Sequence, residues 1–184
     1  MVGCDDHLLL HEQAWVDQDS VLTELQRRCG PLQIRIVADA EVSLAEAVAS
    51  YLFNGQLLAT PSGWTLVVPA ECAEGPASTL IARLIDEGFI ARSLFIDVRE
   101  SMRGGGGPAC LRLRLPLTLD ELGRVHQGIR LDHAQITQLE KWVDAHYRES
   151  LTPADLADPR LIAEAHAAND ALMHLLSQPS QVTL

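Results

Sequence analysis

The amino-acid sequence predicts an α/β fold that is followed by a helical C-terminal segment. Over roughly the first two thirds of the 184 residues, short apolar or alternating runs typical of strands are separated by amphipathic stretches typical of helices. Beyond residue 119 the apolar residues recur at helical spacing, as with Ile136, Leu139, Val143 and Tyr147. A content of 47% hydrophobic and 21% charged residues is ordinary for a chain that buries a core.

The expected strands are short runs with strand-like patterning. Residues 32–37 (LQIRIV) and 109–115 (ACLRLRL) alternate apolar and polar side chains. The turn sequence Thr60-Pro61-Ser62-Gly63 separates two apolar runs and predicts a hairpin. The expected strands are 7–10, 32–37, 56–59, 64–68, 93–98 and 109–115.

The expected helices are amphipathic stretches that follow polar caps. Asp19-Ser20 is expected to cap the first helix, and Ser43 and Glu46 have the spacing of a capping box. Gly88 is expected to end the third helix. The expected helices are 19–28, 43–52, 76–88, 119–126, 132–150, 153–156 and 159–176.

The chain contains no low-complexity linker between its α/β part and its helical part. A run of glycines occurs at 104–107, but it stands between two expected strands. We therefore expect residues 1–184 to form a single unit, with α/β modules over 1–118 and a helical segment over 119–184.

The charge and the cysteine content limit the classes of partner and the cellular compartment that we expect for this protein. A formal net charge of −11 repels a phosphate backbone, so we expect no nucleic-acid partner. No stretch is long and apolar enough to cross a bilayer, and residues 1–6 lack the features of a signal peptide. The four cysteines are scattered without a Cys-x-x-Cys pair, which is typical of free thiols in a reducing cytoplasm. We therefore expect a cytoplasmic protein that does not associate with membranes.

The run Gly104–Gly107, which Pro108-Ala109-Cys110 follows, carries the most chemical information. Consecutive glycines cost backbone entropy, and they suit a place where a ligand approaches the main chain closely. Cys110 stands at the start of an expected strand, beside N–H groups that can stabilise a thiolate. The residues alone leave a second interpretation open, a flexible surface loop next to a buried cysteine. A phosphate-binding loop does not fit, because no Lys-Ser or Lys-Thr follows and the next expected element is a strand.

The histidines give weaker signals. His11 and Glu12 follow an expected strand, and we expect them to be solvated polar residues of a loop or helix start rather than an acid–base pair. The histidines of the helical segment lack a cysteine or acidic cluster that would complete a ligand set. We therefore expect no metal site.

Residues 97–114 (DVRESMRGGGGPACLRLR) resemble the nucleophile-loop signature of the N-succinylarginine dihydrolase family. Other stretches resemble the same family in the same order along the chain. These are 51–58 (YLFNGQLL), 67–72 (VVPAEC), 142–148 (WVDAHYR) and 151–159 (LTPADLADP). The resemblance runs nearly end to end and implies that Cys110 occupies the nucleophile position.

The resemblance implies a pentein-type fold, a propeller of repeated ββαβ modules around a central site, of which this chain would hold roughly two. It implies hydrolysis of N2-succinyl-L-arginine to N2-succinyl-L-ornithine, two ammonia and carbon dioxide, a step of arginine catabolism. The Cys110 thiolate would attack the guanidinium carbon, a histidine would protonate the leaving ammonia and carboxylates would hold the guanidinium. No metal or organic cofactor is implied.

The chain departs from the family pattern in two ways. The family's catalytic histidine belongs to a His-Asn-Asp sequence upstream of the strand that matches 7–10, and its catalytic glutamate lies further upstream. No His-Asn-Asp occurs in this sequence, so the chain resembles a C-terminal portion, either a fragment or one half of a split protein, and we expect it to be inactive alone. Gly104 stands at the position of a family asparagine that contacts substrate, so that side-chain contact is lost.

Two functions of different classes remain. The chain is either the nucleophile-bearing part of a succinylarginine dihydrolase, with N2-succinyl-L-arginine as its small-molecule substrate, or a non-catalytic α/β binding or assembly module that retains a relic nucleophile loop. In both cases missing modules would leave apolar surface uncovered. We therefore expect association, as a homodimer or with an N-terminal partner chain.

Overall fold

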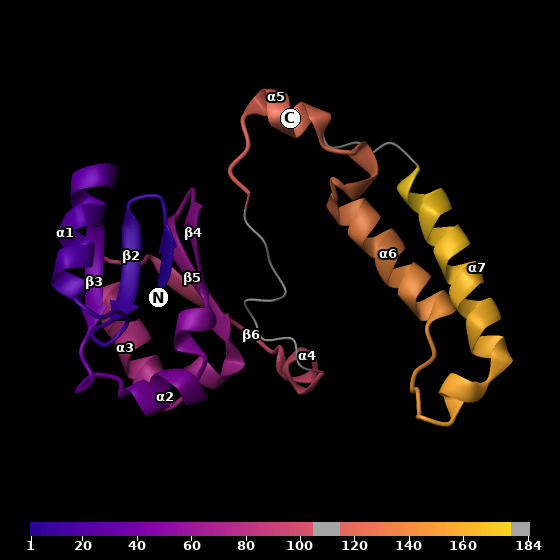
Figure 1. Ribbon diagram of the computed structural model, residues 1–184, viewed down its shortest axis with the longest axis horizontal. Helices are drawn as coiled ribbons and strands as arrows, with labels where there is room; N and C mark the ends of the chain where they lie inside the picture. The colour runs from indigo at the N-terminus through magenta and orange to yellow at the C-terminus, as the bar shows by residue number, and fades with distance from the viewer. Residues whose placement is uncertain (105–114, 178–184) are drawn as a thin grey trace. The chain divides into compact units, whose positions relative to one another are not determined.

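The computed structural model describes residues 1–104 and 115–177 and divides the chain into two compact units, with the boundary between Arg114 and Leu115. The first unit is α/β and the second is helical (Figure 1). The α/β class followed by a helical segment is therefore confirmed. The expectation that both parts form one unit stays a prediction.

The first half of the α/β unit is a three-stranded sheet with one helix. Strand β1 (Val2–Cys4) runs antiparallel to β2 (His7–His11), and β3 (Gln33–Val37) returns parallel to β2 after helix α1 (Gln18–Cys29). The β1–β2 turn holds Asp5 in the left-handed region, at φ 49°. The order of elements is therefore ββαβ.

The second half repeats this topology. Strands β4 (Gln56–Thr60) and β5 (Gly63–Pro69) form the expected hairpin, helix α3 (Gly75–Asp86) follows, and β6 (Arg92–Ile96) returns parallel to β5. The α/β unit therefore contains two ββαβ modules in succession.

A short connection joins the two modules. It contains helix α2 (Leu44–Ala49), whose cap is the expected Ser43, and the 3-10 helix η1 (Leu52–Asn54). The Ser43 hydroxyl accepts the Glu46 N–H over 3.2 Å. Strands β1 and β4, the first strand of each module, lie next to each other.

The two modules share one apolar core. Most core side chains come from the strands and from the inner face of α3. Aromatic packing also crosses between the modules, because the His7 ring lies 4.3 Å from the Trp64 ring and 5.2 Å from the Phe89 ring, measured between centroids. The completely buried aliphatic side chains are Leu9, Leu10, Leu52, Leu57, Leu66, Leu84 and Val37.

The segments that follow β5 and β6 are short helices. The 3-10 helix η2 (Ala70–Ala73) follows β5, and the short helix α4 (Arg99–Arg103) follows β6. Residues 92–96 form an edge strand of their sheet as described, and Leu94, Phe95 and Ile96 are each more than two fifths exposed. An apolar strand with that exposure fits the expectation that further chain covers this unit.

The helical unit is a hairpin of two long helices preceded by short elements. Helices α6 (His133–His146) and α7 (Pro159–Leu176) pack against each other, and Trp142 Nε1 of α6 donates to the Ala168 carbonyl of α7 over 3.0 Å. Within the described part of this unit, Gly128 and Ala168 are the buried residues. The short elements are α5 (Leu119–Arg124), η4 (Gln127–Ile129) and η5 (Asp155–Ala157).

Several expected boundaries were wrong. The expected helix 43–52 ends at Ala49, before left-handed Tyr51 (φ 54°). Helix α1 starts at Gln18, because left-handed Asp17 (φ 53°) turns the chain into the helix before the expected Asp19-Ser20 cap. Strand β6 stops at Ile96, because the Asp97 side chain accepts the Arg99 N–H and starts α4. Helix α6 ends at His146, where Tyr147 becomes extended (φ −96°, ψ 141°).

Two observations bear on the larger architecture. No helix in residues 1–104 or 115–177 is long and apolar enough to cross a membrane. Within the same residues the sheets form no closed ring. The expected strand 109–115 lies outside the described residues except for Leu115, which is not in a strand.

Candidate functional site

Cys110, the predicted nucleophile, lies outside the described residues. Gly104, the first residue of the glycine run, is described and exposed at the C-terminus of α4. Its N–H donates to the Glu100 carbonyl over 3.2 Å, and its φ of −76° is open to any residue. A Cβ at Gly104 would meet its nearest neighbour, the Ser101 carbonyl oxygen, at 3.4 Å. The position therefore has room for the asparagine that the resemblance predicts there.

A charged group precedes the glycine run. The Arg99 guanidinium donates to Asp97 through Nε (3.0 Å to Oδ1) and Nη2 (2.6 Å to Oδ2). These hydrogen bonds lower the pKa of Asp97 to about 2 and raise that of Arg99. The same Nε lies 3.9 Å from Oε1 of Glu71, a residue of η2.

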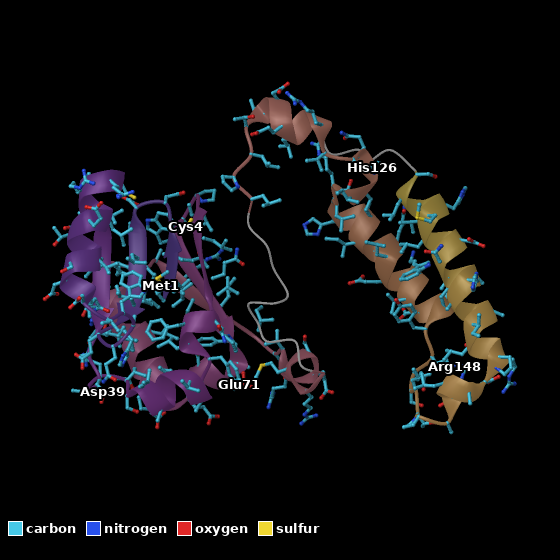
Figure 2. The ribbon with its side chains drawn as sticks, in the orientation of Figure 1. Met1, Cys4, Asp39, Glu71, His126 and Arg148 are labelled. Atoms are coloured by element: carbon cyan, nitrogen blue, oxygen red, sulfur yellow. The ribbon has the colours of Figure 1, made fainter. Side chains whose placement is uncertain are left out.

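Glu71 of η2 has a partly buried carboxylate (labelled in Figure 2). Its side chain is 23% exposed, and its Oε2 atom is buried without a hydrogen-bond partner among the described residues. A buried carboxylate oxygen is costly unless a cation or donor lies near it. The nearby Arg99 guanidinium therefore stabilises the Glu71 side chain in its partly buried position.

Cys72, next to Glu71, is a structural thiol. It is completely buried, and its Sγ–H donates to the Ser50 carbonyl over 3.1 Å. Burial raises the pKa of its thiol to about 11. Cys72 is therefore protonated at neutral pH, which makes it a poor nucleophile.

His11 was wrongly expected to be a solvated residue. It is 2% exposed at the end of β2, because the strand carries its side chain into the core. Its Nδ1 accepts the Gln13 N–H over 3.2 Å, which leaves Nε2 to donate to the Val42 carbonyl over 3.0 Å. With both ring nitrogens engaged by the main chain, His11 fixes the loop after β3 and takes no catalytic role.

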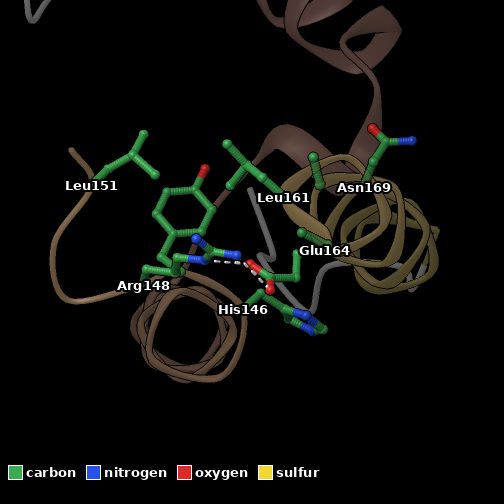
Figure 3. Close-up of a pocket in the computed structure, with 9 residues that line it drawn as sticks. His146, Arg148, Leu151, Leu161, Glu164 and Asn169 are labelled. Carbon is green, nitrogen blue, oxygen red and sulfur yellow. Dashed lines mark hydrogen bonds and ion pairs between the residues drawn. The ribbon is translucent and has the colours of Figure 1, made fainter. Parts of the chain in front are cut away.

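The helical unit contains a cavity of about 440 Å³ (Figure 3). Apolar side chains of α7 and of the loop after α6 line it, among them Leu151 and Leu161. Arg148 crosses it to Glu164, with Nε 2.6 Å from Oε2 and Nη2 2.8 Å from Oε1. Asp155 and Asp158 also face Arg148, at 3.3 and 3.5 Å. With its donors taken by three carboxylates, this arginine ties the loop to α7.

Glu71 and the Asp97–Arg99 pair were not among the site residues expected from the sequence. Their positions along the chain could have pointed to them. Glu71 follows β5 and Asp97 follows β6, and two parallel strands end at the same edge of their sheet. The described residues contain no group of three metal-ligating side chains.

A model of the succinylarginine dihydrolase family matches residues 1–182. The chain belongs to this family. A protein of Paraburkholderia xenovorans named N-succinylarginine dihydrolase is 43% identical over 185 residues, which cover 95% of this chain and 41% of the relative. Proteins of the same name from Marinobacter nauticus and Shewanella piezotolerans are 44% and 40% identical, again over 95% of this chain and 40% of theirs.

Membership of the succinylarginine dihydrolase family confirms the resemblance that was drawn from the sequence. The chain spans about two fifths of the length of these curated relatives. The matched range runs through η2, α4, Gly104 and Cys110. The roles of Gly104 and Cys110 stay predictions.

Proposed function

We propose that this chain supplies the nucleophile-bearing part of an N-succinylarginine dihydrolase and that Cys110 is the nucleophile. The observation that carries the proposal is the family match over residues 1–182, which includes the whole segment from Asp97 to Cys110. The substrate would be N2-succinyl-L-arginine. With two molecules of water it would yield N2-succinyl-L-ornithine, two ammonia and carbon dioxide.

The proposed chemistry is covalent catalysis in two rounds. The Cys110 thiolate adds to the guanidinium carbon, and the adduct expels one ammonia after a histidine has protonated that nitrogen. Water then adds to the carbon and displaces the thiolate, which leaves a ureido group. A second attack expels the second ammonia, and hydrolysis releases a carbamate that loses carbon dioxide to give the ornithine amine.

The repeated topology supports a pentein-type propeller as the complete fold. The order of elements is β1-β2-α1-β3 and then β4-β5-α3-β6, and the first strands β1 and β4 are neighbours. We propose that other modules complete the ring.

The missing groups define the proposed partner. Covalent catalysis needs a histidine and a carboxylate, and His11 is committed to main-chain contacts. We propose that an N-terminal region supplies both groups, on a longer chain or on a separate one, in the cytoplasm. Association with a second copy would cover apolar surface but would not supply a His-Asn-Asp sequence.

Ammonia release from N2-succinyl-L-arginine tests the proposal. The purified chain is assayed alone and with the N-terminal portion of a related succinylarginine dihydrolase, with Cys110→Ser and the exposed Cys29→Ser as a matched pair. We expect release only in the combined sample, its loss in Cys110→Ser and its persistence in Cys29→Ser. Stable association without any release would contradict the proposal.

Gly104 favours the second candidate, a non-catalytic assembly module with a relic loop. The family's asparagine is absent there, and the exposed glycine offers a ligand its backbone alone. On this view the combined sample associates without releasing ammonia. Restoring the side chain by Gly104→Asn would then leave the sample inactive.

A further inference from the structure

The cavity of the helical unit has apolar walls from two segments (Figure 3). Leu161, Ala165 and Ala168 line it from α7, and their spacing of four and then three residues places them on one face of that helix. Tyr147 and Leu151 line it from the segment that follows α6. The cavity therefore combines one apolar stripe of α7 with two apolar side chains of that segment.

Ion pairs hold the two walls in place. The Arg148 guanidinium donates from Nε and Nη2 to the two carboxylate oxygens of Glu164, over 2.6 and 2.8 Å. Asp155 and Asp158 face the same guanidinium. Hydrogen bonding to Arg148 is the main cause that lowers the pKa of Glu164, so the pair is ionised at neutral pH. A paired guanidinium has a fixed geometry, and the cavity is therefore formed before a partner binds.

The cavity has the size and the exposure to receive a side chain of another protein surface. Its volume is about 440 Å³. A cavity of about 150 Å³ already holds a benzene ring, so a large aromatic or aliphatic side chain fits. Tyr147 and Leu151 are 61% and 54% exposed, and Ala168 is the buried member of the nine lining residues. Apolar surface that is exposed in this way gains free energy when a partner covers it.

The length of the family's proteins indicates which surface covers the cavity. The Paraburkholderia xenovorans relative matches 95% of this chain, including the hairpin of α6 and α7, but the match covers 41% of the relative. More than half of that protein is therefore additional chain. A second copy of this chain fits less well, because residues 115–184 contain ten aspartate or glutamate residues and five lysine or arginine residues. Two such acidic hairpins repel each other.

We propose that this cavity is the docking site for the N-terminal region of the dihydrolase, which inserts a large apolar side chain against Leu161 and Ala165. The inference rests on the proposed function, in which that region supplies the missing catalytic groups, and it names the surface that receives the region. A side chain that fills a preformed apolar pocket contributes much of the binding energy of an interface.

Co-expression of the full chain with the N-terminal portion of the Paraburkholderia xenovorans relative tests the inference. The complex is co-purified, and its dissociation constant is measured by isothermal titration calorimetry. Leu161→Asp places a carboxylate in the cavity, and Ala165→Trp fills it. The matched controls are Ile162→Asp and Ala163→Trp, at neighbouring exposed positions of α7 that do not line the cavity.

We expect Leu161→Asp and Ala165→Trp to weaken the association by at least about tenfold, because one buries an unpaired charge and the other excludes the inserted side chain. Ile162→Asp and Ala163→Trp should bind as wild type does. Circular dichroism of each variant checks that α6 and α7 remain helical. Ala165 is exposed, so its replacement disturbs no core packing and separates a loss of docking from a loss of folding.

Three results would overturn the inference. The first is a lack of association in the co-expressed wild type, and the second is an equal change in the cavity variants and their controls. The third is a dimer of the chain alone, seen by sedimentation velocity, that Leu161→Asp dissociates, because the cavity would then receive a second copy.

The ammonia-release assay separates this inference from the proposed function. Ammonia release together with unchanged affinity in Leu161→Asp and Ala165→Trp would contradict the docking site alone. Association that depends on Leu161 but yields no ammonia would contradict the proposed function alone.

Discussion

Arg35 of the first ββαβ module donates a hydrogen bond from Nε to Oε2 of Glu87 in the second module, over 2.9 Å. The same guanidinium binds Glu41 at 2.8 Å, and Arg83 of α3 reaches Glu41 at 2.6 Å. The four side chains form a connected series, Glu87–Arg35–Glu41–Arg83, in which Glu41 accepts from both modules. This group joins β3 to α3 at the surface, outside the shared apolar core.

Glu41→Gln should destabilise the α/β unit by about 1–2 kcal/mol at neutral pH, because two arginines lose a charged acceptor. Hydrogen bonding to Arg35 is the main cause that lowers the pKa of Glu41 from 4.5 to about 2. A lowered pKa in the folded state gives stability that is present above 4.5 and lost as the pH falls toward 2. The measurement is urea unfolding as a function of pH.

The exposed Glu12→Gln is the control for Glu41→Gln. Wild type and Glu12→Gln should lose stability in parallel below pH 4.5, and Glu41→Gln should show a shallower acid dependence. If the free energy of unfolding fell with pH at the same slope in all three proteins, ionisation of Glu41 would not contribute to stability.

Gly55→Ala should destabilise the protein by about 1–3 kcal/mol through overpacking. The backbone at Gly55 has an ordinary φ of −63°, so the cost is steric. A Cβ there would lie 2.8 Å from Val68 Cγ1 and 2.9 Å from the Val67 carbonyl oxygen. The measurement is the free energy of unfolding in urea.

Gly123→Ala provides the opposite control. Gly123 lies in α5, and no atom of the described residues lies within 4 Å of the position that a Cβ would take, so alanine should stabilise that helix by about 0.5–1 kcal/mol. A destabilisation of similar size at both glycines would argue against close packing as the cause at Gly55.

Trp142→Phe should loosen the helical hairpin by about 1 kcal/mol, because the Ala168 carbonyl of α7 loses the Nε1 donor. Thermal unfolding followed by far-ultraviolet circular dichroism measures the loss. Tyr147→Phe is the matched control, since it keeps a ring 5.2 Å from that of Trp142 and removes a hydroxyl from an exposed side chain. If Tyr147→Phe lowered the thermal stability as much as Trp142→Phe, the loss could not be assigned to the Trp142–Ala168 hydrogen bond.

Cys72 should resist modification at mildly alkaline pH. Its pKa is raised to about 11 by burial, so Cys29 should react with a thiol reagent at least about tenfold faster. The raised pKa also predicts that stability falls as the pH rises above 9, where the unfolded thiol ionises and the folded thiol does not. Cys72→Ala should reduce this loss of stability above pH 9. An unchanged loss in Cys72→Ala would show that Cys72 is not its cause.

Gly104→Asn should change the free energy of unfolding by no more than about 0.5 kcal/mol, because its φ is accessible to asparagine and its Cβ position is uncrowded. Chemical denaturation measures this value. A large destabilisation would show that glycine is required by the backbone at this position.

Local signals in the sequence were enough for most of the fold. The hairpin around Pro61-Ser62 and the Ser43 cap follow from turn chemistry and capping. Strand β1 escaped prediction because three residues are too few to show a period. Helix α4 was not predicted, because the Asp97 side chain that accepts the first N–H of this helix belongs to the run 93–98, which has the pattern of a strand.

The sequence by itself determined the family, the two-module order of elements and Cys110 as the position to test, since these depend on residue identity and local pattern. Only the tertiary structure decided that His11 is a buried structural residue and that Arg99 links Asp97 to Glu71. Residues 71 and 99 are far apart in sequence, and they come together because β5 and β6 pair in parallel. That pairing depends on packing over the whole sheet, which a local pattern of residues does not contain.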